Sequence, residues 1–139
     1  MKNIEIINFE IKGDSRGSLI SIENLKNIPF DIKRIYYIFN TLDDVIRGKH
    51  AHKKLEQVLI CLSGSCYIDL DTGIEKTSFL LDSPQKGLYI KDMVWREMRN
   101  FSSNTVLLVL ASDFYNENDY IRNYESFILE TNKLNGKNS

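Results

Sequence analysis

The sequence predicts an all-β protein, a sandwich or barrel with one short helix at its C-terminal end. Short β-rich segments separated by turn residues recur between residues 5 and 111, whereas helical periodicity appears only near residue 118. Many short strands at regular spacing are typical of sandwiches and barrels. The length of 139 residues favours a single domain over residues 1–139.

The first predicted strands flank a turn-rich segment. Residues 5–11 are rich in β-formers, residues 13–17 have turn chemistry, and residues 18–23 are expected to be a partner strand. The next strand is predicted over residues 32–39. Its two faces carry Arg34, Tyr36 and Ile38 on one side and Ile35, Tyr37 and Phe39 on the other, and we expect one face to line a pocket.

The histidine-containing stretch 48–57 continues into an apolar run at 58–62, which predicts a buried strand ending at the 63–65 turn. A meander follows, with strands expected at 66–70, 76–81, 87–90, 94–98 and 105–111. Further on, Ile121, Tyr124, Phe127 or Ile128, and Thr131 recur at helical spacing. With Asn118 as a cap, they predict a helix over about 118–131.

Composition excludes several classes of function. A net charge of −1, from 18 basic and 19 acidic residues, argues against nucleic acid as the main partner. No apolar run approaches the roughly 20 residues that cross a bilayer, and the start lacks a signal-peptide core, so we expect a cytoplasmic protein without a membrane partner. Cys61 and Cys66 lack a second pair for zinc and are interpreted as reduced strand cysteines.

Both histidines of the chain, His50 and His52, lie two residues apart. On a strand, side chains two apart leave the same face, so both imidazoles should point at one place. Such a pair indicates a metal site or a proton-transfer site, and the alternative is a pair of structural or surface histidines. The surrounding residues must decide.

The His-x-His pair within an all-β chain resembles the first motif of the cupins, which are small jelly-roll β-sandwiches. Metal-binding cupins have a glutamate where this chain has Gln57, and a further histidine where it has Arg96. A guanidinium cannot ligate a cation. Glu56 is no substitute, because it should face away from Gln57. We therefore expect no metal.

Without a metal, the histidines remain as acid and base, and the arginines indicate an anionic ligand. Arginine suits bidentate contacts to phosphate. The candidates near the expected pocket mouth are Arg16, Arg34, Arg47 and Arg96. The alternative for any of them is an ordinary surface ion pair.

Over nearly its whole length the chain resembles the cupin-fold sugar 3,4-ketoisomerases that act on dTDP-4-keto-6-deoxyglucose. The resemblance lies in segments 14–19, 28–30, 33–39, 47–57 and 119–124, and the run RGKHAHKKLEQ is its most specific part. It implies an isomerase without metal or cofactor, and a homodimer whose subunits exchange N-terminal strands. It also implies a dTDP-sugar substrate, on the route to a 3-amino-3,6-dideoxyhexose of a polysaccharide or S-layer glycan.

Moving a ketone from C4 to C3 requires removal of the C3 proton, an enediolate, and protonation at C4. Two histidines on one face can do this without a cofactor. We expect His52 to be the carbon base and His50 to relay protons between the oxygens, with the reverse assignment open. Tyr37 and Arg47 would orient or polarise the sugar oxygens. The nucleotide and sugar would be held by Arg16, Arg34, Gln57 and Arg96.

Three alternatives remain at this point. A dTDP-sugar 3,5-epimerase shares the chemistry but usually pairs one histidine with an aspartate and a tyrosine, and a non-catalytic cupin would bind a small ligand without reactive histidines. A metal-dependent oxygenase is a third, weaker interpretation. The product configuration also stays open: relatives with a galacto-configured product carry histidine at the position of Arg96, which favours the gluco product, whereas Arg16 matches them.

Overall fold

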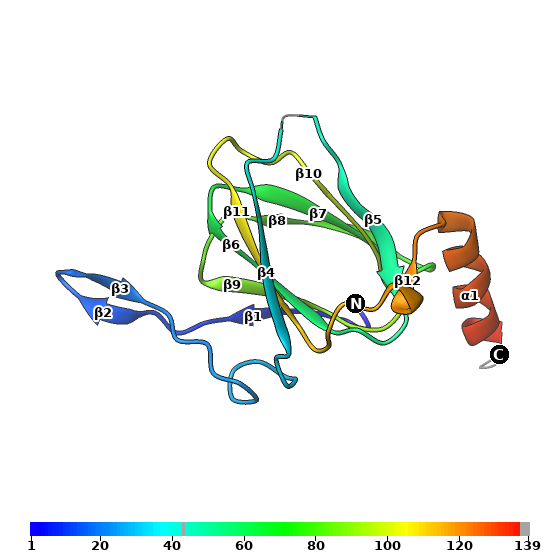
Figure 1. The fold of residues 1–139 in the computed structure, drawn as a ribbon, viewed down its shortest axis with the longest axis horizontal. Helices are drawn as coiled ribbons and strands as arrows, with labels where there is room; N and C mark the ends of the chain where they lie inside the picture. The colour runs from blue at the N-terminus through cyan, green and yellow to red at the C-terminus, as the bar shows by residue number, and fades with distance from the viewer. Residues whose placement is uncertain (43, 137–139) are drawn as a thin grey trace.

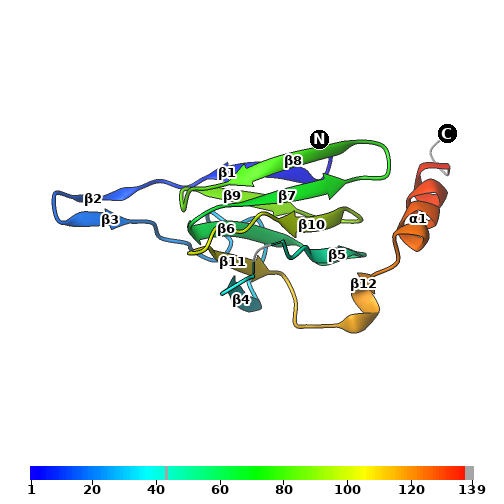
Figure 2. The same cartoon turned by 90° about the horizontal axis from the view of Figure 1, so that it is seen from above.

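The computed structural model describes residues 1–42 and 44–136. Within them, two five-stranded antiparallel sheets pack face to face (Figures 1 and 2). The first sheet has the order β1 (Ile4–Asn8), β9 (Lys86–Ile90), β6 (Gln57–Ser63), β11 (Val106–Ala111) and β4 (Arg34–Phe39). The second has the order β12 (Tyr120–Ile121), β5 (Arg47–His52), β10 (Trp95–Arg99), β7 (Cys66–Asp71) and β8 (Lys76–Leu81). The predicted all-β sandwich with one C-terminal helix is confirmed.

The main core lies between the sheets. Alternate residues of β6 and β7 enter it, including Leu59, Cys61, Cys66 and Ile68, all 0–2% exposed. The other face of β6 packs Val58 and Ile60 into a second cluster. Because β6 buries both faces, its sequence is a continuous apolar run rather than an alternating one. Both cysteines are free and buried, as predicted.

The predicted continuous strand through residues 48–62 is wrong. The chain leaves the second sheet after His52 and enters the first at Gln57, so residues 53–56 form a turn between β5 and β6. Partners distant in sequence hold this turn: the Asp119 carboxylate accepts the amides of Lys54 and Leu55 at 2.9 and 3.1 Å. The hydroxyl of Ser112 accepts the next amide at 2.9 Å. These contacts have no local signature in the sequence.

The helix begins later than predicted. Helix α1 spans Tyr124–Gly136, and Asn123 rather than Asn118 caps it, accepting the Ser126 amide at 2.9 Å. The expected first turn is instead the 3₁₀ segment η1 (Glu117–Asp119) followed by the edge strand β12, which pairs with β5. The periodic residues Phe127 and Thr131 are nevertheless buried, so the pattern identified the packed face.

A hairpin of β2 (Lys12–Asp14) and β3 (Gly17–Leu19) projects from the sandwich as an arm (Figures 1 and 2). Every residue of these two strands is exposed. The predicted strand 18–23 is therefore only partly correct, since β3 ends at Leu19 and pairs with β2 instead of β1. The described part of the chain has no helix long and apolar enough to cross a membrane.

Candidate active site

The two histidines meet inside the sandwich at the end of β5. Their ring centroids are 4.8 Å apart, which confirms that both imidazoles point at one place. His52 is 1% exposed, whereas His50 is half-buried. A bulge precedes them: Gly48 and Lys49 have φ of 84° and 56°, and the β5–β10 register shifts between Arg96 and Glu97. A Cβ at Gly48 would lie 2.9 Å from the Arg96 carbonyl oxygen, so glycine fits this close approach.

Tyr120 forms an aromatic wall against both histidines. Its ring centroid lies 5.0 Å from that of His50 and 4.3 Å from that of His52. The β12–β5 pairing places it directly opposite His52. We did not predict Tyr120 as a site residue, because no local sequence pattern distinguishes it from the neighbouring tyrosines. The one signal for this segment was the family resemblance over residues 119–124.

Arg96 is buried beside the histidines in a hydrogen-bonded chain. Its guanidinium donates to Gln57 Oε1 at 2.5 Å and to the Val94 carbonyl at 3.0 Å. Gln57 in turn donates through Nε2 to the Tyr36 hydroxyl at 3.0 Å. Both ends of the Gln57 amide are therefore occupied by neighbours. Gln57 therefore holds Arg96 and Tyr36 in position.

The site carries buried positive charge with unused donors. Among the described residues, the buried Nε atoms of Arg34 and Arg96 have no hydrogen-bond partner. Burial lowers the pKa of Arg96 to about 10, so the guanidinium is still charged near neutral pH. A buried charge is costly unless it is paired. This arrangement is suited to an anionic ligand, or to a negative charge that develops during a reaction.

The histidines are neutral near pH 7. Burial and then Arg96 lower the pKa of His50 to about 4, and burial, Arg96 and His50 lower the pKa of His52 to about 2. His50 Nδ1 is 3.1 Å from the Gly48 carbonyl oxygen. A carbonyl only accepts, so Nδ1 carries the hydrogen and Nε2 keeps its lone pair. His50 can therefore act as a proton acceptor.

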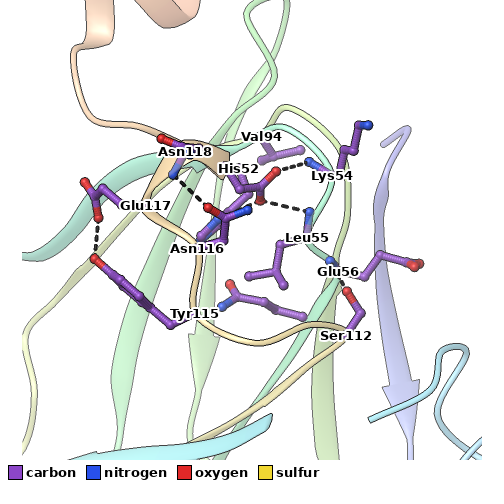
Figure 3. A network of polar contacts seen from close by, with 12 residues as sticks. His52, Lys54, Leu55, Glu56, Val94, Ser112, Tyr115, Asn116, Glu117 and Asn118 are labelled. Atoms are coloured by element: carbon purple, nitrogen blue, oxygen red, sulfur yellow. Dashed lines mark hydrogen bonds and ion pairs between the residues drawn. The ribbon is translucent and has the colours of Figure 1, made fainter. Parts of the chain in front are cut away.

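A cavity of about 150 Å³ adjoins His52. Its lining includes Arg34, Asp119 and Tyr120 together with residues 112–114 and Asn116, part of which is drawn in Figure 3. Small-molecule sites generally measure about 300–1,000 Å³. The cavity is therefore smaller than a typical small-molecule site.

The other predicted site residues are distributed differently. The Tyr37 side chain leaves the outer face of β4 and is 61% exposed, while Tyr36 takes the inner position. Arg47 pairs with the buried Met98, so it leaves the same sheet face as His50, at the exposed start of β5. Arg16 lies between β2 and β3, on the arm that projects from the sandwich (Figure 1), and pairs with Asp14 at 2.5 Å.

The ligand set of a metal-binding cupin is replaced in this site. Arg96 pairs with His50 across β10 and β5, at the position where metal-binding cupins have a histidine. Over residues 1–42 and 44–136, no three His, Cys, Asp or Glu side chains gather as a metal would require. The donor set present suits proton transfer next to an anion better than cation binding.

Comparisons with known proteins agree over almost the whole chain. The family model FdtA, described as WxcM-like, C-terminal, matches residues 2–132. A curated TDP-4-oxo-6-deoxy-alpha-D-glucose-3,4-oxoisomerase from Aneurinibacillus thermoaerophilus is 56% identical over 131 residues, covering 94% of each chain. Among solved structures, a 3,4-ketoisomerase from Helicobacter canadensis has a TM-score of 0.91 at 58% identity, over 94% of this chain and 98% of its own.

A second solved structure is a 3,4-ketoisomerase from Thermoanaerobacterium thermosaccharolyticum. It has a TM-score of 0.93 at 50% identity, and the match covers 96% of both chains. That protein was crystallised as a histidine-to-asparagine variant in complex with TDP-4-keto-6-deoxyglucose. The sandwich described above is thus the cupin jelly roll of these enzymes.

Proposed function

The chain belongs to the FdtA family of WxcM-like proteins, and from this premise we propose that it converts dTDP-4-keto-6-deoxyglucose into a dTDP-3-keto-6-deoxyhexose. Its close relatives are TDP-sugar 3,4-ketoisomerases. One observation in this chain carries the proposal: two neutral histidines lie together beside two arginines with unused buried donors. Proton transfer and stabilisation of an anion are the two requirements of a ketone shift.

The reaction begins at C3, whose proton is acidified by the neighbouring C4 carbonyl. In our proposal, His52 takes this proton and the bonding electrons form the C3–C4 double bond, leaving negative charge on the C4 oxygen. His50 then accepts the C3 hydroxyl proton and delivers it to the C4 oxygen. Finally His52 returns its proton to C4, and the C3 oxygen becomes the ketone. One hydrogen has moved between carbons and one between oxygens, so atoms and charge balance.

Charge on the enediolate needs donors that are already in place. The Arg96 guanidinium is buried and fixed by Gln57, so it costs no reorganisation when the oxyanion forms. The Tyr36 hydroxyl accepts its hydrogen bond from Gln57, which leaves its own proton free for a sugar oxygen. We assign to Tyr36 the role that we first predicted for Tyr37. Arg34 and Arg47 would contact the anionic parts of the nucleotide sugar.

We further propose that the protein acts as a homodimer that exchanges N-terminal segments. The outer face of edge strand β4 exposes Ile35, Tyr37 and Phe39 at 60%, 61% and 55%, a contiguous apolar surface typical of an interface. Among residues 1–42 and 44–136, the β2–β3 arm forms a separate two-stranded sheet with no pairing to the sandwich. In an exchanged dimer, the arm would carry Arg16 toward the partner, where the small cavity needs further contacts.

The ketone at C3 is the group that an aminotransferase would replace in making a 3-amino-3,6-dideoxyhexose for a surface glycan. We propose this pathway as the destination of the product. The two free cysteines are compatible with a reducing compartment, and we propose the cytoplasm as the place of action.

A 3,5-epimerase is the second candidate, because one observation favours it. His52 stands beside Asp119 and Tyr120, which is the kind of histidine, aspartate and tyrosine set that we associated with epimerases. The two reactions differ in outcome. The ketoisomerase moves the carbonyl, while the epimerase leaves it at C4 and inverts C3 and C5.

Incubation with dTDP-4-keto-6-deoxyglucose and NMR of the product separate these functions. We expect the C4 carbonyl carbon signal to be replaced by a C3 carbonyl, with C5 unexchanged in deuterated water. The coupling constants at C4 also give the gluco or galacto configuration. Deuterium at C5 with the ketone still at C4 would establish the epimerase. Binding of the sugar nucleotide to the protein without any chemical change in the sugar would establish a non-catalytic cupin.

A further inference from the structure

Asp119 stands behind the imidazole of His52. Its Oδ2 atom lies 3.3 Å from His52 Nδ1, with the two side chains 17% and 1% exposed. The pair is at ion-pair distance but is not aligned as a hydrogen bond, and neither ring nitrogen of His52 has an aligned partner among the described residues. Catalytic hydrogen bonds are often long or misaligned without substrate and tighten when it binds.

The Asp119 carboxylate is held in place independently of the histidine. It accepts the amides of Lys54 and Leu55, and the Asp119 carbonyl accepts the Lys53 amide at 2.9 Å. These contacts fix the turn that follows His52 (Figure 3). The β12–β5 pairing then begins at the next residue, opposite His52 itself. The carboxylate and the imidazole are therefore positioned by one local framework.

A carboxylate only accepts hydrogen bonds, so it favours the ring form with the hydrogen on Nδ1. The lone pair is then on Nε2. We infer that Asp119 is a positioning residue for His52, which keeps Nε2 unprotonated as the proton acceptor and balances the positive charge that forms when Nε2 takes a proton. The inference deepens the proposed function and rests on it for the identity of the reaction.

The charges around His52 show why such a partner matters. Arg96, Arg34, Arg122 and the neighbouring His50 all oppose a positive charge on the ring. Asp119 is the carboxylate on the opposite side, within ion-pair distance. His50 differs, because its Nδ1 faces the neutral Gly48 carbonyl. His52 has a carboxylate within ion-pair distance of its Nδ1, which agrees with its assignment as the carbon base in the ketone shift.

The substitution Asp119→Asn tests the inference. An asparagine amide can donate to Nδ1 and would move the ring hydrogen to Nε2. We expect the ¹⁵N NMR signals of His52 to change from the Nδ1–H to the Nε2–H form. The His52 signals are assigned as those that remain in the His50→Asn variant, since the chain has only two histidines. We also expect kcat to fall by about 10²–10⁴-fold, the usual contribution of general acid-base catalysis, with KM nearly unchanged; the equivalent change in a serine-protease triad costs about 10⁴-fold.

The substitution Asp71→Asn is the matched control. The Asp71 carboxylate also accepts a backbone amide, that of Gly73 at 2.7 Å, and a side-chain donor, the Tyr124 hydroxyl at 2.5 Å. It contacts neither histidine, so this variant should lose comparable stability while its histidine signals and kcat stay within about twofold.

Two results would overturn the inference. One is an Asp119→Asn protein that retains both the wild-type ring form and the wild-type kcat. The other needs no variant: a wild-type spectrum with the His52 hydrogen on Nε2 would refute it even if Asp119→Asn fails to fold. If the wild-type protein shows the Nδ1–H form but does not move the ketone, the proposed function fails and the positioning role stands.

Discussion

Replacing Tyr36 and Tyr37 separately with phenylalanine tests which face of β4 lines the site. The Tyr36 hydroxyl is the acceptor for Gln57 Nε2 at 3.0 Å, and Gln57 also holds Arg96. Removing the hydroxyl leaves a buried donor without a partner, which costs about 1–3 kcal/mol of folding free energy. If the hydroxyl also donates to the developing oxyanion, its loss lowers kcat by about 10²–10³-fold.

Tyr37→Phe is the control on the adjacent residue. Its ring is 61% exposed on the outer face, and phenylalanine keeps that ring for the proposed dimer interface, so we expect stability within about 0.5 kcal/mol of the wild type and kcat within about twofold. The assay measures initial rates of product formation by NMR at saturating substrate, with urea unfolding as a separate measurement. A normal kcat for Tyr36→Phe, or a loss confined to Tyr37→Phe, would refute our placement of the site.

Three further predictions concern stability and assembly. The free energy of unfolding, measured in urea, should fall by up to about 2 kcal/mol per histidine as pH decreases from 7 to 5, because unfolded histidines protonate near pH 6.5 whereas the folded pKa values are about 4 for His50 and about 2 for His52. The substitution His50→Asn should remove about half of this pH dependence. A free energy of unfolding that does not change with pH would contradict the buried neutral pair. Phe127→Ala should lower the free energy of unfolding by about 3–5 kcal/mol, because this ring is 0% exposed. Leu129, on the same helix, is 63% exposed, so Leu129→Ala should lower it by less than about 0.5 kcal/mol. Equal losses in the two variants would contradict the packing of α1 on the sandwich. Light scattering should give the mass of two chains, and Phe39→Asp should shift it toward one; a monomeric wild type at micromolar concentration would exclude the proposed dimer.

Side-chain alternation explains which parts of the site were predictable. His50 and His52 lie on one strand, and the period of two placed them together correctly. The same period divided residues 34–39 into two faces but did not identify the inner one, because both faces mix aromatic and aliphatic residues. That choice depends on the pairing of β4 with β11, which is set far away in the chain.

The remaining differences also come from long-range contacts. The turn after His52 is closed by Asp119, 65 residues from Lys54, so the local apolar pattern suggested one continuous strand. Ile121 fits a helical repeat and an edge strand equally well, and only pairing with Ala51 of β5 decides between them. Asp119 looked like part of a helix start, and its contact with His52 emerges only in three dimensions.

The most direct test follows the C3 proton of dTDP-4-keto-6-deoxyglucose in deuterated water with the wild type, His50→Asn and His52→Asn. We expect the wild type to move the ketone with solvent exchange at the reacting carbons. We expect His52→Asn to lose C3 exchange and His50→Asn to lose product formation, while both bind dTDP within a few-fold of the wild type. Undiminished exchange and turnover in both variants would show that the imidazoles do not carry the reaction.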